Sequence, residues 1–227
     1  DGALPQPEAI EHPARHGRDV RLIAACGLKR EARIIARACP DAVTVIGGGV
    51  AAQLETRLEL AVEGFAGVIL SCGIAGALSP ELKPGDVVID GDERIVERLR
   101  RAIPDAVRGR IVGGDAILAS AAAKRALRDA TGGAAVDMES HIAARVAGRR
   151  GLAFGAVRAI SDGAEDDLPP AALVGMRPDG GMALGAVLAS LARDPRQLPA
   201  LIRTGRQADR AFAGLKAAME AVSRIID

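Results

Sequence analysis

The stretch A-F-G-A-V-R-A-I-S-D-G-A, residues 153–164, joins an apolar run to an arginine, a serine and an aspartate. Small and apolar residues at 154–157 predict a buried strand, and the polar residues follow towards its end. Ligands of α/β proteins bind where strands of the central sheet end, at their carboxyl edge. Asp162 is therefore a candidate site residue.

A second acidic cluster, D-M-E at residues 137–139, also stands between a strand-like segment and a helix-like one. Two carboxylates at strand ends suit a reaction with a positively charged transition state and a leaving group that needs a proton. The alternative is that these residues are helix N-caps, because Asp and Ser are favoured at that position. The residues alone leave both interpretations open.

Working outward from this stretch, strand-like and helix-like patterns alternate along the chain, which predicts an α/β sandwich around a mainly parallel sheet. We expect a loosely ordered lead-in over residues 1–19, which hold three prolines and no periodicity, and a single domain over residues 20–227. The predicted strands are 20–26, 42–46, 67–71, 86–90, 134–136 and 153–160. The predicted helices are 28–38, 50–62, an Ala-rich segment to 130, and 140–148.

Composition excludes several classes of protein. The chain has 227 residues, of which 49% are hydrophobic but only 1% aromatic, so its core and any pocket must be aliphatic. A net charge of +1 argues against nucleic-acid binding.

No apolar run is long enough to span a bilayer. The three cysteines form no CxxC pair, so we expect a cytoplasmic protein without a disulfide or zinc site. His12 and His16 have ligand-like spacing but lack a third ligand, and we expect no metal and no cofactor.

The triplet Gly47-Gly48-Gly49 follows a predicted strand and precedes a predicted helix. Such a loop brings backbone N–H groups close to a phosphate or a ribose, although it also serves as a tight turn. It is neither a Walker loop, since no G-K-[ST] follows, nor a dinucleotide fingerprint.

Six motifs occur in order along residues 20–165. They are A-C-G-L-K-R-E-A (25–32), G-G-G-V-A-A (47–52), C-G-I-A-G-A-L-S-P-E-L-K-P-G-D-V-V-I (72–89), G-G-D-A (113–116), V-D-M-E-S (136–140) and V-R-A-I-S-D-G-A (157–164). Their order resembles the nucleoside phosphorylase and methylthioadenosine/S-adenosylhomocysteine nucleosidase superfamily. The resemblance implies a three-layer α/β/α sandwich with a central mixed, partly barrelled sheet, assembled as a homo-oligomer, a dimer or larger.

The resemblance also implies roles for individual residues in cleaving a purine nucleoside. Asp162 matches the aspartate that protonates or hydrogen-bonds the purine N7, and burial would help it to hold the proton. Glu139 matches the carboxylate that binds the ribose hydroxyls and favours a cationic sugar. Residues that match neighbours of the substrate are Met138, Arg158, Ser161, Gly48, Gly73, Asp137 and Ile117.

The nucleophile is left open by two adjacent residues. Glu31 matches the glutamate that orients the attacking water in nucleosidases, whereas Arg30 and Gly49 are candidates for binding inorganic phosphate as a co-substrate. Side chains of helical neighbours point in different directions, so we expect only one of Glu31 and Arg30 to face the ribose.

Two positions depart from the family. Ile74 removes a hydroxyl from the nucleophile site, and Ile117 stands where aromatic stacking on the base is common.

Beyond residue 165 the chain resembles the hopanoid-associated phosphorylase subgroup, through residues 166–181 and 193–205. That subgroup implies release of adenine from adenosylhopane with a ribosyl-hopane product. The resemblance favours phosphorolysis, which we expect, while the hydroxyl lost at Ile74 keeps hydrolysis as the alternative. The segment 198–226 predicts an amphipathic helix whose basic residues either face water or meet anionic lipid at the inner membrane surface. The alternatives are a soluble methylthioadenosine/S-adenosylhomocysteine nucleosidase and a non-catalytic nucleoside-binding module.

Overall fold

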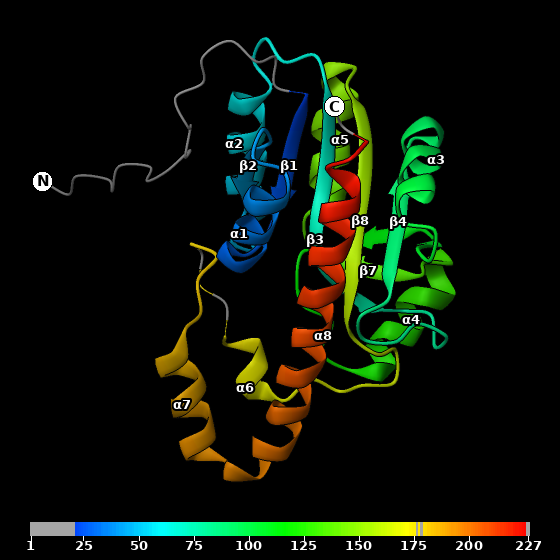
Figure 1. Ribbon diagram of the computed structural model, residues 1–227. Coiled ribbons are helices and arrows are strands. Elements are labelled where there is room, and N and C mark those ends of the chain that lie inside the picture. Colours follow the sequence, from blue (N-terminus) through cyan, green and yellow to red (C-terminus); the bar gives the residue numbers. More distant parts are fainter. Residues whose placement is uncertain (1–20, 176, 178, 226–227) are drawn as a thin grey trace, which may run out of the picture.

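The computed structural model describes residues 21–175, 177 and 179–225, so the lead-in and its two histidines lie outside the described residues (Figure 1). Eight strands form one sheet. They are β1 (Leu22–Cys26), β2 (Val43–Ile46), β3 (Val68–Ala77), β4 (Val87–Gly91), β5 (Val107–Arg108), β6 (Ile111–Gly113), β7 (Ala135–Asp137) and β8 (Ala153–Asp162). The helices are α1 (Lys29–Ala38), α2 (Ala51–Ala61), α3 (Glu93–Ala102), α4 (Ala121–Thr131), α5 (Ser140–Arg150), α6 (Pro170–Leu173), α7 (Leu184–Arg193) and α8 (Leu198–Val222), with a 3₁₀ turn at Pro195–Gln197.

The sheet is mixed and has the strand order β2-β1-β3-β8-β4-β5. Most pairs are parallel, as expected, but β4 runs antiparallel to β8 and β7 runs antiparallel to the end of β3. β3 and β8 are the longest strands and pair along almost their whole length. Because β7 joins the far end of β3, and β6 joins β7, the sheet branches beside the carboxyl ends of the central strands.

Helices cover both faces of the sheet, which confirms the sandwich. Alternate residues of β1 point to opposite faces: Ala24 packs with α1, α3 and α8, whereas Ile23 packs with α2 and α5. The C-terminal half of α8 completes the first layer through Leu215 and Met219, both fully buried. All these layers are aliphatic, as the composition requires.

Helix α3 and helices α6 and α7 were not among the predicted elements. Helix α3 has a buried apolar stripe of Ile95, Val96 and Leu99 among charged residues, so the apolar pattern was present but short. The predicted C-terminal helix is confirmed, yet only its second half caps the sheet: none of the residues before Ala211 in α8 is buried.

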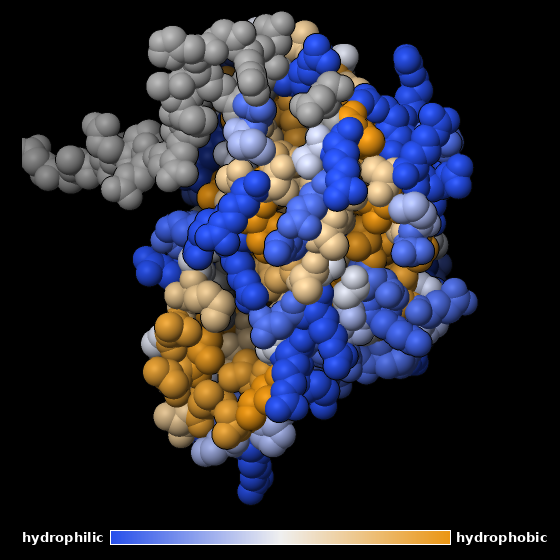
Figure 2. Space-filling view, in the orientation of Figure 1, coloured by the Kyte–Doolittle hydropathy of each residue, from blue (hydrophilic) through white to orange (hydrophobic). Residues whose placement is uncertain are grey.

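Helices α6, α7 and the first half of α8 form a helical extension, residues 170–210, that protrudes beyond the sheet (Figure 1). Hydrophobic residues gather on its surface in the space-filling view (Figure 2). Its large exposed hydrophobic residues are Leu173, Val174, Met182, Leu184, Leu188, Leu198 and Ile202. Among the described residues, no helix combines the length and apolar content needed to cross a bilayer.

Candidate active site

Arg158 is the centre of a buried polar cluster between the carboxyl ends of β1 and β7 and the middle of β3. Its side chain is fully buried, and its Nη2 lies 2.5 Å from Asp137 Oδ2 at the end of β7. Its Nη1 lies 3.3 Å from Glu139 Oε2, just before α5. Ser71 Oγ also accepts from Nη2, at 2.6 Å. One guanidinium therefore holds both acidic residues of the D-M-E cluster.

Glu31 enters the same cluster from the first turn of α1. Its Oε2 accepts the backbone N–H groups of Gly27 and Leu28 at 2.9 and 2.8 Å, and its Oε1 accepts that of Ile74 on β3 at 2.8 Å. Burial raises the pKa of Glu31, while the positive charge of Arg158 and these N–H groups act in the opposite direction. The carboxylate thus caps α1 and ties it to β3, in addition to any chemical role.

Two glycines make room for this convergence. A Cβ on Gly73 would lie 2.4 Å from Arg158 Nη1 and 2.5 Å from Glu31 Oε1. A Cβ on Gly27 would lie 2.5 Å from Glu139 Oε1. Both positions therefore need glycine for close approach of charged side chains, which gives Gly73 a physical reason to belong to the site.

The pKa of the Glu139 carboxyl is set by opposing effects of burial and of neighbouring charges. Burial raises its pKa to about 7, Arg158 opposes that rise, and the nearby charges of Asp137 and Glu31 add to it. Three carboxyl groups therefore share one arginine, and the raised pKa values of Glu31 and Glu139 mean that this cluster retains protons to a higher pH than free glutamates would.

Asp162 ends β8 four positions after Arg158, and the residues opposite them on β3, Gly76 and Gly73, are three positions apart, about 10 Å of strand at 3.3 Å per residue. A β-bulge lies between them: Ala75 pairs with Ile160 but Gly76 pairs with Asp162, so Ser161 is the extra residue. Bulges re-aim side chains, and here the Ser161 hydroxyl donates to Asp162 Oδ1 at 2.6 Å. Asp162 begins no helix, so the N-cap alternative is wrong for this residue.

The N-cap alternative holds in part for the other cluster. Asp137 accepts the backbone N–H of Ser140 at the start of α5, at 3.1 and 3.2 Å to its two oxygens. Glu139 occupies the N-cap position itself but makes no capping hydrogen bond with its side chain. Its carboxyl faces Arg158 instead.

Lys124 is a site residue that the sequence interpretation missed. It comes from α4, is completely buried, and its Nζ lies 2.5 Å from Asp162 Oδ2. Its neighbours in A-A-A-K-R-A-L-R-D give no sign of a buried face, because a lone lysine among alanines is usually solvated. Only the position of the helix against the end of β8 reveals it.

The remaining predicted residues take various positions. Met138 is half-buried beside the acidic cluster, and Ile117 is exposed on the segment before α4. Gly48 and Gly49 both have positive φ, and the N–H of Gly48 already bonds Gly27 O, so the triplet is a tight turn. Arg30 turns away from the cluster: it pairs with Asp209 at 2.9 Å and lies over the ring of Phe212.

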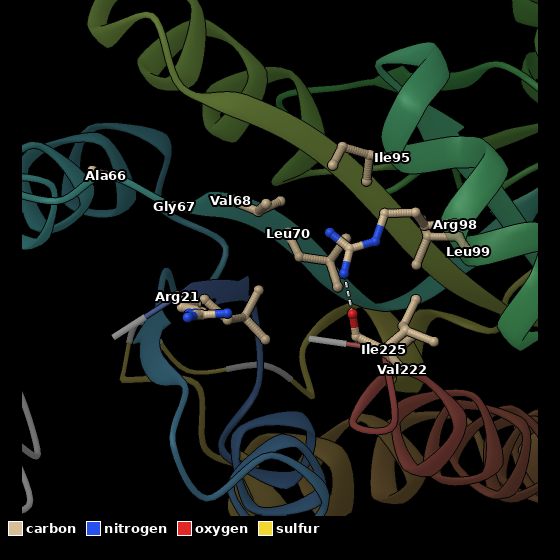
Figure 3. A pocket seen from close by; sticks show the side chains of 11 residues that line it. Arg21, Ala66, Gly67, Val68, Leu70, Ile95, Arg98, Leu99, Val222 and Ile225 are labelled. Carbon is tan, nitrogen blue, oxygen red and sulfur yellow. Dashed lines mark hydrogen bonds between the residues drawn. The ribbon is translucent and has the colours of Figure 1, made fainter. Parts of the chain in front are cut away.

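A cavity of about 240 Å³ lies at the opposite edge of the sheet from this cluster (Figure 3). It is lined by the first residues of β1 and β3, by α3 and by the end of α8, and its polar groups are the side chains of Arg21 and Arg98. Arg98 is already bonded to the carbonyl of Ile225. None of the candidate site residues lines it, and no group of three potential metal ligands occurs among the described residues.

Comparison with known proteins finds one matching family model and several structures of similar fold. Residues 90–193 match the model of the phosphorylase superfamily. The 5′-methylthioadenosine/S-adenosylhomocysteine nucleosidase of Neisseria meningitidis, solved with methylthio-immucillin-A, is similar in fold, with a TM-score of 0.67 and 18% identity over 90% of this chain and 99% of that one. The S-adenosylhomocysteine nucleosidase of Streptococcus pyogenes gives 0.60 and 17% over 89% and 97%.

The futalosine hydrolase of Helicobacter pylori is also similar, with a TM-score of 0.54 and 17% identity over 63% of this chain and 88% of that chain. A search of curated proteins returned no match. At these identities the structural likeness establishes the fold, an α/β nucleosidase-like sandwich, and the superfamily match covers the segment that contains Asp137, Glu139, Arg158 and Asp162.

Proposed function

We propose that this protein is an enzyme that cleaves the N-glycosidic bond of a purine nucleoside and releases adenine. The observation that carries the proposal is the placement of Asp162 about four strand residues beyond the cluster of Glu31, Glu139 and Arg158. That separation suits a nucleoside whose base meets Asp162 while its ribose meets Glu139. The reaction as proposed needs no cofactor.

Each residue has a defined task in this mechanism. Asp162 delivers a proton to the departing purine, so that the base leaves as a neutral molecule. Ionised Glu139 binds the ribose hydroxyls and stabilises the positive charge that develops on the sugar. Arg158 holds Glu139 in place, and Met138 packs against the ribose. Adenine release by the purified protein tests the proposal, and binding without release would instead indicate a nucleoside-binding module.

For the nucleophile, the geometry favours water over phosphate. Glu31 turns inward and can take a proton from water, whereas Arg30, the residue on which the phosphate expectation rested, pairs with Asp209. Phosphate would also meet a cluster with three carboxyl groups and one arginine. Adenine release measured across a phosphate titration decides between them: a rate that rises with phosphate would restore phosphorolysis.

The proposed substrate is a lipid-linked adenine nucleoside, adenosylhopane, in hopanoid biosynthesis. Support comes from the aliphatic composition and from the helical extension, whose exposed face carries Leu184 at 62% and Leu188 at 65% exposure. A patch of this kind on a protein surface marks an interaction site. The competing substrates are the soluble nucleosides methylthioadenosine and S-adenosylhomocysteine, and comparison of kcat/KM for adenosylhopane in mixed micelles with both soluble compounds tests the choice.

We also propose that the extension meets the anionic inner face of the membrane from the cytoplasm. Its exposed arginines, Arg193, Arg196, Arg203 and Arg206, make no ion pair through their side chains with other described residues. By contrast, the arginines of α5 are paired with glutamates of α2. An apolar face flanked by unpaired cations suits an anionic lipid surface.

Sedimentation with vesicles of phosphatidylglycerol and phosphatidylcholine tests this contact. Wild type should bind, and the variant Leu184→Glu/Leu188→Glu should not, while Leu60→Glu, an equally exposed leucine on α2, serves as the matched control. We propose a homo-oligomer, a dimer or larger, and light scattering on the same variants checks it. Loss of the oligomer in Leu184→Glu/Leu188→Glu, with vesicle binding retained, would assign this face to a second subunit.

A further inference from the structure

Lys124 is the only buried residue of α4, so the one buried side chain of this helix is a charged one. Every other residue of that helix is exposed or half-buried, so the helix contributes to the interior chiefly one ammonium group. Burying a charge without a partner is expensive, and lysines are seldom fully buried unless they are paired. The buried ammonium of Lys124 therefore needs acceptors for all of its N–H groups.

Three oxygens surround Nζ: Asp162 Oδ2 at 2.5 Å, Gly163 O at 2.8 Å and Asp166 O at 3.0 Å. An ammonium has three N–H donors, and each of them has one acceptor here. The other oxygen of Asp162, Oδ1, accepts the hydroxyl of Ser161. In this state Lys124 is charged, Asp162 is a carboxylate, and Asp162 itself carries no proton to deliver.

The same arrangement also accommodates the proton on the aspartate. A neutral amine has two N–H donors, which can remain on the carbonyls of Gly163 and Asp166, and a lone pair, which can accept the O–H of a protonated Asp162. Moving the proton over 2.5 Å therefore breaks no other hydrogen bond. It also replaces a buried ion pair by two neutral groups, which removes the cost of keeping two charges in a buried site.

We propose that Lys124 supplies the proton that Asp162 passes to the leaving purine, so that the two residues share one dissociable proton. This inference rests on the proposed function. An N–H bond of Nζ breaks and leaves its electron pair on nitrogen, as an O–H bond forms at Asp162 Oδ2. That O–H bond then breaks as the purine N7 takes the proton, while the electrons of the glycosidic bond move into the base. Lys124 regains its proton from solvent after the products leave, which balances the proton that Glu31 takes from water and releases.

Few other charged groups face this pair. The Asp166 carboxylate accepts N–H groups from Gly163 and Gln207, and the Asp167 carboxylate accepts that of Ala121 at the start of α4. Glu165 and Arg125 pair with each other at the surface. The side chains of β3 beside Asp162 include no titratable group, because Gly76 stands opposite it. The charged neighbours of the pair are therefore engaged with other groups.

Substrates that differ in their leaving group test the relay. Lys124→Met and Asp162→Asn should each lower kcat about 10²–10⁴-fold for the adenine nucleoside that wild type cleaves, the usual worth of general acid catalysis. Both should cleave 4-nitrophenyl riboside with little loss, because nitrophenolate leaves without a proton. Lys216→Met, an exposed lysine in an i,i+4 pair with Glu220, is the matched control.

A double variant keeps the test decisive if Lys124→Met folds poorly. Lys124→Met/Asp162→Asn removes both buried charges, so it should recover stability in thermal denaturation without recovering adenine release. Its loss in kcat should equal that of either single variant, since the two residues act as a unit. Equal losses on both substrates would show that Lys124 is merely structural, and undiminished adenine release would also overturn the inference. A wild-type protein that cleaves neither substrate would instead refute the proposed function.

Discussion

At the scale of single residues, the charge of Glu139 makes activity depend on pH. Its ordinary pKa of 4.5 is raised to about 7 in the folded chain, chiefly by burial. If the ionised form stabilises the cationic sugar, kcat/KM, which reports groups of the free enzyme, should increase as the pH rises through about 7 and then level off. Glu139→Gln should have a low kcat with no such limb, and a variant in which only KM changes would reduce Glu139 to a binding residue.

The same group also affects stability, in the opposite direction. Between its unfolded pKa of 4.5 and its folded pKa of about 7, the folded chain binds more protons than the unfolded chain. The free energy of unfolding should therefore fall as pH rises through this window. Urea denaturation across that range should show a shallower fall in Glu139→Gln, and an identical slope would mean that Glu139 is ionised throughout.

Glu31 is the second residue whose two roles can be separated. In Glu31→Gln the amide cannot take a proton from water, so kcat should fall about 10²–10⁴-fold. The new NH₂ group would also face backbone donors, Gly27 and Leu28 or Ile74, and should cost about 1–3 kcal/mol of stability. Steady-state kinetics and thermal melts measure the two effects. Retained activity in a destabilised variant would leave Glu31 as a cap of α1 only.

At the scale of elements, the close approach of the Arg158 and Glu31 side chains to the backbone of β3 at Gly73 can be tested by substitution. Gly73→Ala should displace Arg158 or Glu31, lowering activity and costing about 1–3 kcal/mol by overpacking. Gly148→Ala is the matched control. No atom lies within 4 Å of that Cβ position in α5, so it should gain about 0.5–1 kcal/mol from helix propensity. Denaturant unfolding of both variants checks the contrast.

The two halves of α8 should respond very differently from each other. Leu215→Ala creates a cavity against the sheet and should cost about 2–5 kcal/mol. Ile202→Ala, in the exposed first half, should change the free energy of unfolding by no more than about 0.5 kcal/mol. Comparable losses in the two variants, measured by urea denaturation, would show that the first half is packed in solution.

These elements also show what sequence patterns can reveal. Side chains alternate along a strand, so an apolar strand such as β1 is expected to pack on both faces, as Ile23 and Ala24 do. The carboxyl edge of the sheet can be located because polar residues interrupt the apolar strands there. The bulge at Ser161 and the burial of Lys124 could not be predicted, because both depend on contacts between β8 and distant segments. The orientation of Arg30 likewise depends on α8, through Asp209 and Phe212.

At the scale of the whole molecule, the helical extension and the sandwich should respond separately to salt. If the unpaired arginines of the extension attract anionic lipid, vesicle binding should weaken as ionic strength rises, because counterions screen exposed charges. Adenine release from a soluble nucleoside should change much less, since Arg158 and its partners are buried. Binding that is insensitive to salt would mean that the apolar face acts without the arginines.

The attachment of the loop after β8 to the start of α4 has a kinetic consequence. Asp167 accepts the N–H of Ala121, and Leu168 donates to Ala119, so two segments far apart in the chain fasten each other. Asp162 can meet Lys124 only after this long-range closure, which is slower than the formation of local helices. During refolding from urea, adenine-releasing activity should therefore return later than the far-ultraviolet circular dichroism signal. The contact between Lys124 and Asp162 would then form last, and catalysis would begin only with that step.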